Sequence, residues 1–516
     1  MTKKIPADIV IYNVTVITMN SKNPVVSGVA IAGNKFIGLL DKNDDWPLSS
    51  SGQAIDGKGM TLLPGLIDAH FHLKAEISND FSISCDNHSV KSITEIISLL
   101  KYRAKFTLEN QWLRAINYDV FYLKECRHPS RWDLDEASTN HPIRLRHVTR
   151  HASVLNSRAL ALAGIHIDSI DPPGVTIERN ELTNEPTGLI LGGDAWLSKE
   201  VIPPLTHDEL TIGATQLQNR LLSKGIVAIS DATPTNTVFD LKFWSSQIEN
   251  SWPIPIQFMT SINNYEQMFH FTKKLTNQEA QFLEMGPIKV VIESVPELQP
   301  NLEKLTSIAM RATKANIPLA IHVVEPEMIL IALEAIRLAM NEYPNRHLRH
   351  RLEHLSLCPE AFLKEISDLG ISVVTNPPLI YNHGDRYLND VDSSMHEWLY
   401  RMNSVLTANI NLAAGSDAPI ASLDPWIGIR TSCTRITASG NTLGLNEKLE
   451  RMQALKLYTT NAAKVIGWET SRGMIYPGYN ADFICLTENP LTCTIKQLNN
   501  LTVIETWING KRVFKT

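Results

Sequence analysis

The pattern of hydrophobic and polar residues at the two ends of the chain differs from the pattern in its middle. Residues 7–40, 478–486 and 501–514 are rich in Val, Ile and Thr and are interrupted by Asn-Pro, Gly-Asn and Asn-Gly pairs. This pattern is typical of short antiparallel strands joined by tight turns. Because two β-rich ends of one chain often meet in one sheet, we predict a composite β-sandwich domain over residues 1–63 and 473–516.

The middle of the chain contains short, nearly continuous apolar runs, each followed by a helical pattern. Residues 327–340, for example, have apolar side chains at i, i+3, i+4 and i+7, which predicts an amphipathic helix. Apolar runs separated by helices indicate parallel strands covered on both faces, and eight of them favour a closed barrel. The runs are TLLPGLIDAH (61–70), GIVAISDAT (225–233), PIPIQFMTSI (253–262), GPIKVVIES (286–294), IPLAIHVVE (317–325), RHRLEHLSL (349–357), GISVVTNPP (370–378) and INLAAGSDAP (410–419).

The predicted fold class is therefore α/β, with a (β/α)8 TIM barrel over residues 64–472. The interval between the first and second apolar runs is too long for a single crossover helix. We expect residues 75–220 to be largely an insertion subdomain, placed after strand 1, with helices and strands of its own.

Composition and charge narrow the class of protein. A chain of 516 residues that is 43% hydrophobic and 20% charged has the profile of a globular enzyme. Its formal net charge of −6 gives no electrostatic reason to expect a nucleic acid or a membrane as partner. The cysteines form no C-x-x-C pair, no stretch has the length of a membrane span, and Pro6 and Asp8 interrupt the apolar run that a signal peptide needs. We expect a cytoplasmic protein with a small-molecule substrate; whether it forms a homo-oligomer stays open.

Metal-compatible side chains lie at the predicted ends of four strands. His70 and His72 are two residues apart and so share one face of a strand, where both imidazoles can reach one ion. His322, His354 and Asp417 lie near the ends of the fifth, sixth and eighth runs. A single histidine at a strand end is more often a structural residue. Because the carboxyl ends of barrel strands meet at one rim, we interpret the five together as a site for zinc or a similar divalent ion.

These motifs resemble those of the metal-dependent amidohydrolase superfamily, in particular the amidohydrolase-3 branch that includes YtcJ-like proteins and N-substituted formamide deformylase. The similarity runs over essentially the whole chain and is specific for the superfamily, whereas it says little about the substrate. The matching segments are PGLIDAHFHL (64–73), GPIKVVIE (286–293), AIHVVE (320–325), RLEHL (351–355), GDRYL (384–388), GSDAP (415–419) and PGYNADFICL (477–486).

The resemblance implies a cofactor of divalent metal, expected to be Zn2+ with two ions per chain; one ion is the alternative. In this arrangement a more buried ion is held by His70, His72 and Asp417, and a more exposed ion by His322 and His354. Asp417 would also act as general base and acid, because it can accept a proton from the attacking hydroxide and deliver it to the leaving amine.

The resemblance further implies that Lys289 is carboxylated by CO2 and bridges the two ions. An ammonium group cannot bind a cation, whereas a carbamate supplies anionic oxygens. Taken alone, a lysine at a strand end is more often a salt-bridge partner. With Lys289 as a bridge, the expected function is hydrolysis of the C–N bond in an amide, formamide or cyclic amide by a metal-activated hydroxide.

Two alternative functions remain open. His322-Val-Val-Glu325 is an H-x-x-E motif that resembles the deaminase branch, in which the glutamate passes a proton to a ring nitrogen and one metal ion is used. Glu325 could equally be an exposed loop carboxylate. The other alternative is a catalytically silent barrel that serves as a scaffold. The catalytic candidates are thus Asp417, His354 and Glu325.

Four further residues are candidates for substrate binding, and all are expected on loops. Arg386 can bind a substrate carboxylate as a planar two-pronged donor, and a structural salt bridge is an equally good interpretation of it. The four residues are Glu293, Arg386, Tyr387 and His151.

Overall fold

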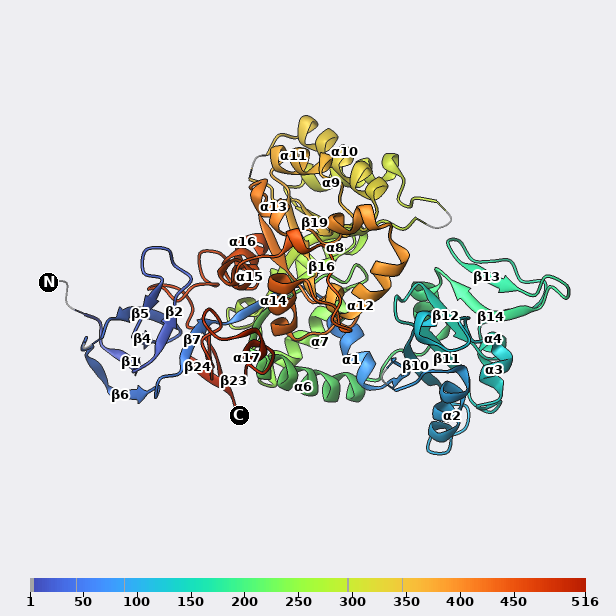
Figure 1. The fold of residues 1–516 in the computed structure, drawn as a ribbon, viewed down its shortest axis with the longest axis horizontal. Helices are drawn as coiled ribbons and strands as arrows, with labels where there is room; N and C mark the ends of the chain where they lie inside the picture. The colour runs from blue at the N-terminus through green and yellow to red at the C-terminus, as the bar shows by residue number, and fades with distance from the viewer. Residues whose placement is uncertain (1–3, 43, 88, 295–296, 346) are drawn as a thin grey trace. The chain divides into compact units, whose positions relative to one another are not determined.

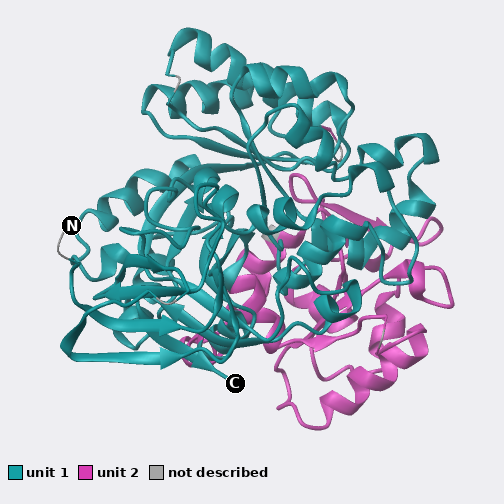
Figure 2. Cartoon of the chain, turned by 60° about the vertical axis from the view of Figure 1, so that its left-hand side comes forward, with its two compact units in different colours: residues 1–73, 215–294, 298–516 teal, residues 74–214, 295–297 magenta. Residues whose placement is uncertain are grey.

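The computed structural model describes residues 4–42, 44–87, 89–294, 297–345 and 347–516. The chain forms two compact units (Figure 2). The first contains residues 1–73, 215–294 and 298–516, and the second is built on residues 74–214.

The first unit is organised around an eight-stranded sheet in which every neighbouring pair is parallel. All residues of six of these strands are buried, because helices cover one face and the barrel interior covers the other. This is the α/β barrel sheet that the apolar runs predict. In sheet order, the strands are β21 (Leu412–Ala414), β20 (Ser372–Thr375), β19 (Arg351–His354), β18 (Leu319–Val323), β17 (Leu283–Val291), β16 (Ile256–Thr260), β15 (Ile226–Asp231) and β8 (Leu66–Phe71).

Hydrogen bonds between the segment after β21 and the end of β8 close the barrel. The backbone N–H of Asp417 donates to the carbonyl of His70 at 2.8 Å, and the N–H of His72 donates to the carbonyl of Ala418 at 3.1 Å. Gly415 makes this approach possible, since a Cβ at that position would lie 2.4 Å from the backbone nitrogen of His70. The seam of the barrel therefore brings the His70 and Asp417 backbones together.

Helices pack around the barrel sheet, with α7 and α8 on β17, α10 on β18 and α16 on β21 (Figure 1). Helix α10 illustrates why: Pro326 occupies its first turn, and its apolar residues at three- and four-residue spacing, such as Ile329, Leu333 and Ile336, are buried. The helices of this unit are α7 (Val238–Glu249), α8 (Ile262–Thr272), α9 (Leu302–Lys314), α10 (Pro326–Glu342), α11 (Ala361–Asp368), α12 (Pro377–Asp390), α13 (Asn403–Thr407), α14 (Pro425–Thr434), α15 (Arg451–Leu457), α16 (Thr460–Ile466) and α17 (Ile495–Asn499).

Both ends of the chain contribute strands to the same six-stranded sheet. Its order is β24 (Lys511–Lys515), β23 (Val503–Ile508), β22 (Phe483–Leu486), β7 (Thr61–Pro64), β2 (Thr15–Ile17) and β3 (Val25–Val26). A four-stranded sheet has the order β5 (Lys35–Leu40), β4 (Gly28–Ala32), β1 (Ala7–Tyr12) and β6 (Leu48–Asp56).

The first apolar run, residues 61–70, contains two strands rather than one. β7 belongs to the six-stranded sheet and β8 to the barrel, and the chain passes from one to the other at Gly65. A Cβ on Gly65 would lie 2.4 Å from methyl carbons of Val227. Periodicity alone does not reveal this break, because every residue of both strands is buried.

The second unit contains its own six-stranded sheet, in the order β13 (Thr176–Arg179), β14 (Pro186–Leu191), β12 (Ala152–Leu155), β11 (Ile143–His147), β10 (Leu113–Tyr118) and β9 (Ile83–Ser84). Helices α2 (Ile93–Ala104), α3 (Arg131–Asp135), α4 (Ser157–Leu162) and α5 (Asp194–Trp196) accompany it, while α1 (Leu73–Asp80) and α6 (His207–Ser223) lead from one unit to the other. Among the helices that the structure describes, none is long and apolar enough to cross a bilayer.

Candidate metal centre

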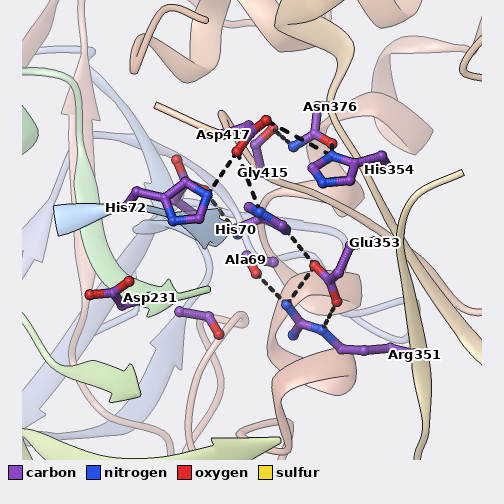
Figure 3. A network of polar contacts seen from close by, with 12 residues as sticks. Ala69, His70, His72, Asp231, Arg351, Glu353, His354, Asn376, Gly415 and Asp417 are labelled. Atoms are coloured by element: carbon purple, nitrogen blue, oxygen red, sulfur yellow. Dashed lines mark hydrogen bonds and ion pairs between the residues drawn. The ribbon is translucent and has the colours of Figure 1, made fainter. Parts of the chain in front are cut away.

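Metal-compatible side chains from different barrel strands converge at the carboxyl ends of those strands. His70 is on β8, with His72 directly after it, and Asp417 follows β21. Their potential ligand atoms all lie within 4.8 Å of one another. Figure 3 shows His70, His72, His354 and Asp417 directed toward one another. The structure thus brings together His70 and Asp417, which are more than 340 residues apart in the sequence.

The distances between these atoms fit a shared cation. Asp417 Oδ1 lies 3.1 Å from His72 Nε2 and 3.4 Å from His70 Nε2. Two ligand atoms bound at about 2.0–2.2 Å to one tetrahedral ion are separated by roughly 3.3–3.6 Å. His70 Nε2 is buried and has no hydrogen-bond partner among the described residues, which is costly for a polar atom unless it binds something else. These three residues therefore suit a divalent ion.

The two remaining histidines extend this group. The ring of His354, the last residue of β19, lies 4.7 Å from the ring of His70 and 4.5 Å from that of His322, which is on β18. His354 has a positive φ of 69° and Asp417 one of 57°. Such backbone strain in non-glycine residues is concentrated at functional sites.

A hydrogen bond behind each of three imidazoles orients its ring. The Nδ1 atoms of His70, His72 and His354 contact Glu353 Oε2 at 2.5 Å, Thr233 Oγ1 at 3.0 Å and Asn376 Oδ1 at 2.7 Å, respectively. A carboxylate can only accept, so His70 Nδ1 carries the proton. Asn376 donates from Nδ2 to the carbonyl of Gly415 at 3.1 Å, so its Oδ1 is an acceptor and His354 Nδ1 is also the donor. In both rings Nε2 keeps its lone pair for a metal.

Burial sets the protonation of these groups. It lowers the pKa of His72 to about 4 and that of His354 to about 3, and it holds the pKa of His322 well below its ordinary value. Neutral imidazole is the form that binds a metal.

Lys289, on β17, has a buried ammonium nitrogen. Its side chain is 3% exposed, and Nζ has no hydrogen-bond partner among the described residues. Burial lowers the pKa of Lys289 to about 8, although Glu353 and Asp417 both act to raise it. A buried lysine without a paired acceptor is unusual in a folded protein.

Four charged or polar residues around this centre were not identified from the sequence. Arg351 and Glu353 are both fully buried on β19 and form an ion pair. Asp68 accepts hydrogen bonds from the N–H groups of His70 at 3.1 Å and Ser416 at 3.0 Å. Asp231, at the end of β15, accepts from the N–H of Thr233 at 3.0 Å. Burial raises the pKa of both Asp68 and Asp231 to about 6.

The sequence contains a signal for the Arg351–Glu353 pair. Arg351 and Glu353 are charged residues two apart in an apolar run, and in a strand buried on both sides such residues must share a face and find partners. The two project into the barrel, since Arg351 Nη2 donates to the carbonyl of Ala69 at 2.8 Å and Glu353 contacts His70.

The other candidate residues have the following positions. Glu325 is exposed and directly precedes α10, and Glu293 is exposed and pairs through its backbone with Gln299. Arg386 and Tyr387 are on α12, so their expected position on a loop was wrong. Arg386 Nε donates to Asp390 at 3.0 Å, which matches the salt-bridge interpretation, and the hydroxyls of Tyr387 and Tyr400 are 3.1 Å apart. His151 is an exposed residue of the second unit.

Comparison with known proteins gives matches along almost the entire chain. The model of the amidohydrolase family matches residues 53–514. An N-substituted formamide deformylase from Arthrobacter pascens is 26% identical over 532 aligned positions, which cover 98% of this chain and 97% of the relative. These sequence matches agree with the resemblance deduced from the motifs.

Two solved structures share the fold. A metal-dependent hydrolase from Pyrococcus horikoshii OT3 superposes with a TM-score of 0.73 at 21% identity, covering 95% of this chain and 99% of the other. The atrazine chlorohydrolase TrzN from Arthrobacter aurescens TC1, complexed with zinc, superposes with a TM-score of 0.57 at 14% identity, covering 98% and 94%.

Proposed function

The chain belongs to the amidohydrolase family and is a hydrolase acting on carbon–nitrogen bonds; on that premise we propose that it cleaves a small amide, formamide or cyclic amide with the help of two divalent ions. The observation that carries this proposal is the convergence of His70, His72 and Asp417, whose ligand atoms lie within 4.8 Å of one another. In this proposal these three residues hold the inner ion, while His322 and His354 hold the outer ion.

We propose that Lys289 is carboxylated and bridges the two ions. Its buried Nζ, which has no hydrogen-bond partner among the described residues, supports this. So does the lowering of its pKa to about 8 by burial, because the neutral amine is the form that combines with CO2. Zinc is the ion that we propose, since imidazole and carboxylate are ligands that suit it.

When bound, the divalent ions would supply water of lowered pKa and polarise the substrate carbonyl. Asp417 is the proton acceptor in this proposal, because an aspartate side chain is a carboxylate at neutral pH. The Asp417 carboxyl group then returns the proton to the nitrogen of the leaving amine as the C–N bond breaks. The walls of the barrel rim keep bulk water from these groups, since Asp417 is only 7% exposed.

The extent of the domains is also a proposal. We propose that the four- and six-stranded sheets form one β-sandwich domain over residues 1–63 and 473–516, and that residues 75–220 are an insertion in the barrel of residues 64–472. A hydrophobic core that contains Ile11 and Val29 from the first part of the chain with Phe483 and Trp507 from the last supports the composite domain.

A single-metal deaminase is the second candidate, and the H-x-x-E motif of His322 and Glu325 favours it. The Glu325→Gln variant distinguishes amide hydrolysis from deamination. We expect Glu325→Gln to change kcat/KM by less than about threefold, because the exposed Glu325 carboxylate has no proton to transfer in C–N hydrolysis at the Asp417 site. In a deaminase the same change removes the proton carrier, with a loss of roughly 10²–10⁴-fold. Steady-state kinetics of the two proteins at equal metal content distinguish these results.

A hydrolysis screen tests the proposed function. Metal-reconstituted protein is incubated with formamides, N-acyl amino acids, hydantoins and aminated heterocycles, and release of amine, formate or ammonia is measured. We expect turnover of at least one amide or formamide that disappears when the metal is chelated. Turnover confined to aminated heterocycles would favour the deaminase, and a metal-loaded protein inert toward every class would favour the silent scaffold.

A further inference from the structure

The three imidazoles with an identified hydrogen-bond partner at Nδ1 differ in the charge of those partners. Thr233 Oγ1 behind His72 and Asn376 Oδ1 behind His354 are neutral, whereas Glu353 behind His70 is a carboxylate. Glu353 forms a two-pronged ion pair with Arg351, so it is a carboxylate. Only one of these three rings therefore has an anion behind it.

We propose that Glu353, held by Arg351, is a positioning residue that sets the affinity of the inner metal ion through His70. This inference rests on the proposed function, since it takes His70 as a ligand of that ion. Glu353 does not itself reach the ion: its Oε2 contacts His70 Nδ1 at 2.5 Å, and the opposite nitrogen, Nε2, is the one near Asp417. An anionic acceptor behind a histidine fixes its tautomer and orientation and makes it a stronger ligand.

Arg351 keeps the Glu353 carboxylate in place and ionised. Its Nε donates to Glu353 Oε1 and its Nη2 to Oε2 at 3.0 Å, so the two side chains form a two-pronged pair. Both are 0% exposed, and a buried carboxylate without such a counter-charge would be strongly destabilised. The same Nη2 also donates to the carbonyl of Ala69 at 2.8 Å. Arg351 therefore fixes both the carboxylate and the backbone next to His70.

The backbone at His354 allows a second side chain to approach His70. Glu353 and His354 are consecutive on β19, so their side chains would point to opposite faces of a regular strand. The positive φ of His354, 69°, interrupts that alternation. The His354 ring therefore lies 4.7 Å from the ring of His70, which Glu353 also contacts.

Metal affinity of three variants tests the proposal. Glu353→Gln keeps the shape of the side chain and removes its charge. Thr233→Val is the matched control, because it removes a neutral hydrogen-bond partner behind His72, another residue that we assign to the inner ion. Zn2+ affinity is measured by competition with a chromophoric chelator, and the ligand field by the visible absorption of the Co2+-substituted proteins. We expect Glu353→Gln to lower the affinity for one of the two ions by roughly 10–100-fold and to shift the Co2+ spectrum. Thr233→Val should lower that affinity by less.

Removal of the charge on Glu353 leaves the buried Arg351 without a counter-charge, so Glu353→Gln is accompanied by the double variant R351M/E353Q, which removes both charges. Thermal unfolding of the metal-free proteins verifies that the variants are folded. We expect the double variant to show the same loss of affinity. Wild-type affinity in the folded double variant, or an equal loss in Thr233→Val, overturns the inference while the proposed function stands. A wild-type chain that binds no divalent ion overturns both.

Discussion

Replacement of Lys289 by alanine is expected to abolish turnover, with a loss of roughly 10³-fold or more, because several kcal/mol of charge stabilisation leave the site with the bridging group. The side chain is 3% exposed and its Nζ has no hydrogen-bond partner among the described residues. Removal of a lysine that merely paired with a carboxylate would not have this effect. The measurement is kcat/KM on the substrate identified by the screen, together with the metal content of the variant.

Chemical rescue makes this prediction specific. The cavity left by Lys289→Ala can admit a short carboxylic acid, whose two oxygens resemble those of a carbamate, so acetate or propionate should restore part of the turnover. Lys304→Ala is a suitable control, because Lys304 is an exposed residue of α9 and its loss should leave both turnover and metal content unchanged. Wild-type turnover in Lys289→Ala would refute the bridging role.

Asp417→Asn is expected to lower kcat by roughly 10²–10⁴-fold, because the amide cannot accept the proton that Asp417 takes up and returns to the leaving amine. Asp417 contacts the Nε2 atoms of His70 and His72. The variant can lose activity because it binds less metal or because it no longer transfers the proton. Kinetics are therefore measured at saturating Zn2+, with the bound metal quantified in the same samples.

The control for this variant lies in the same loop. Asp424→Asn alters an acidic residue whose side chain caps α14 by accepting from the N–H of Trp426 at 3.0 Å, and we expect it to retain turnover. An Asp417→Asn protein that carries its full complement of metal and still hydrolyses substrate at the wild-type rate would contradict the role of Asp417 in proton transfer.

The barrel could be predicted from the sequence because its strands are buried on both faces. That environment produces continuous apolar runs, and all eight correspond to a strand of the barrel sheet. The apolar run 61–70 does not by itself show where β7 ends and β8 begins, since both strands are buried throughout.

The candidate site was partly accessible from the sequence for a similar reason. His70, His72 and Asp417 lie at strand ends, and barrel closure brings such positions to one rim. The partners behind the rings could not be assigned, because the contact between Glu353 and His70 joins β19 and β8, which are not neighbours in the barrel sheet. Arg386 and Tyr387 were expected on a loop, but α12 begins with Pro377-Pro378 and includes them.

Metal analysis of the wild-type protein, purified without chelator, is the most direct test of the central claim that these side chains share bound cations. We expect about two divalent ions per chain, the number found in two-metal hydrolytic sites, and loss of both ions and of turnover on treatment with a strong chelator. A protein that retains no divalent ion, even after dialysis against Zn2+, would contradict the account.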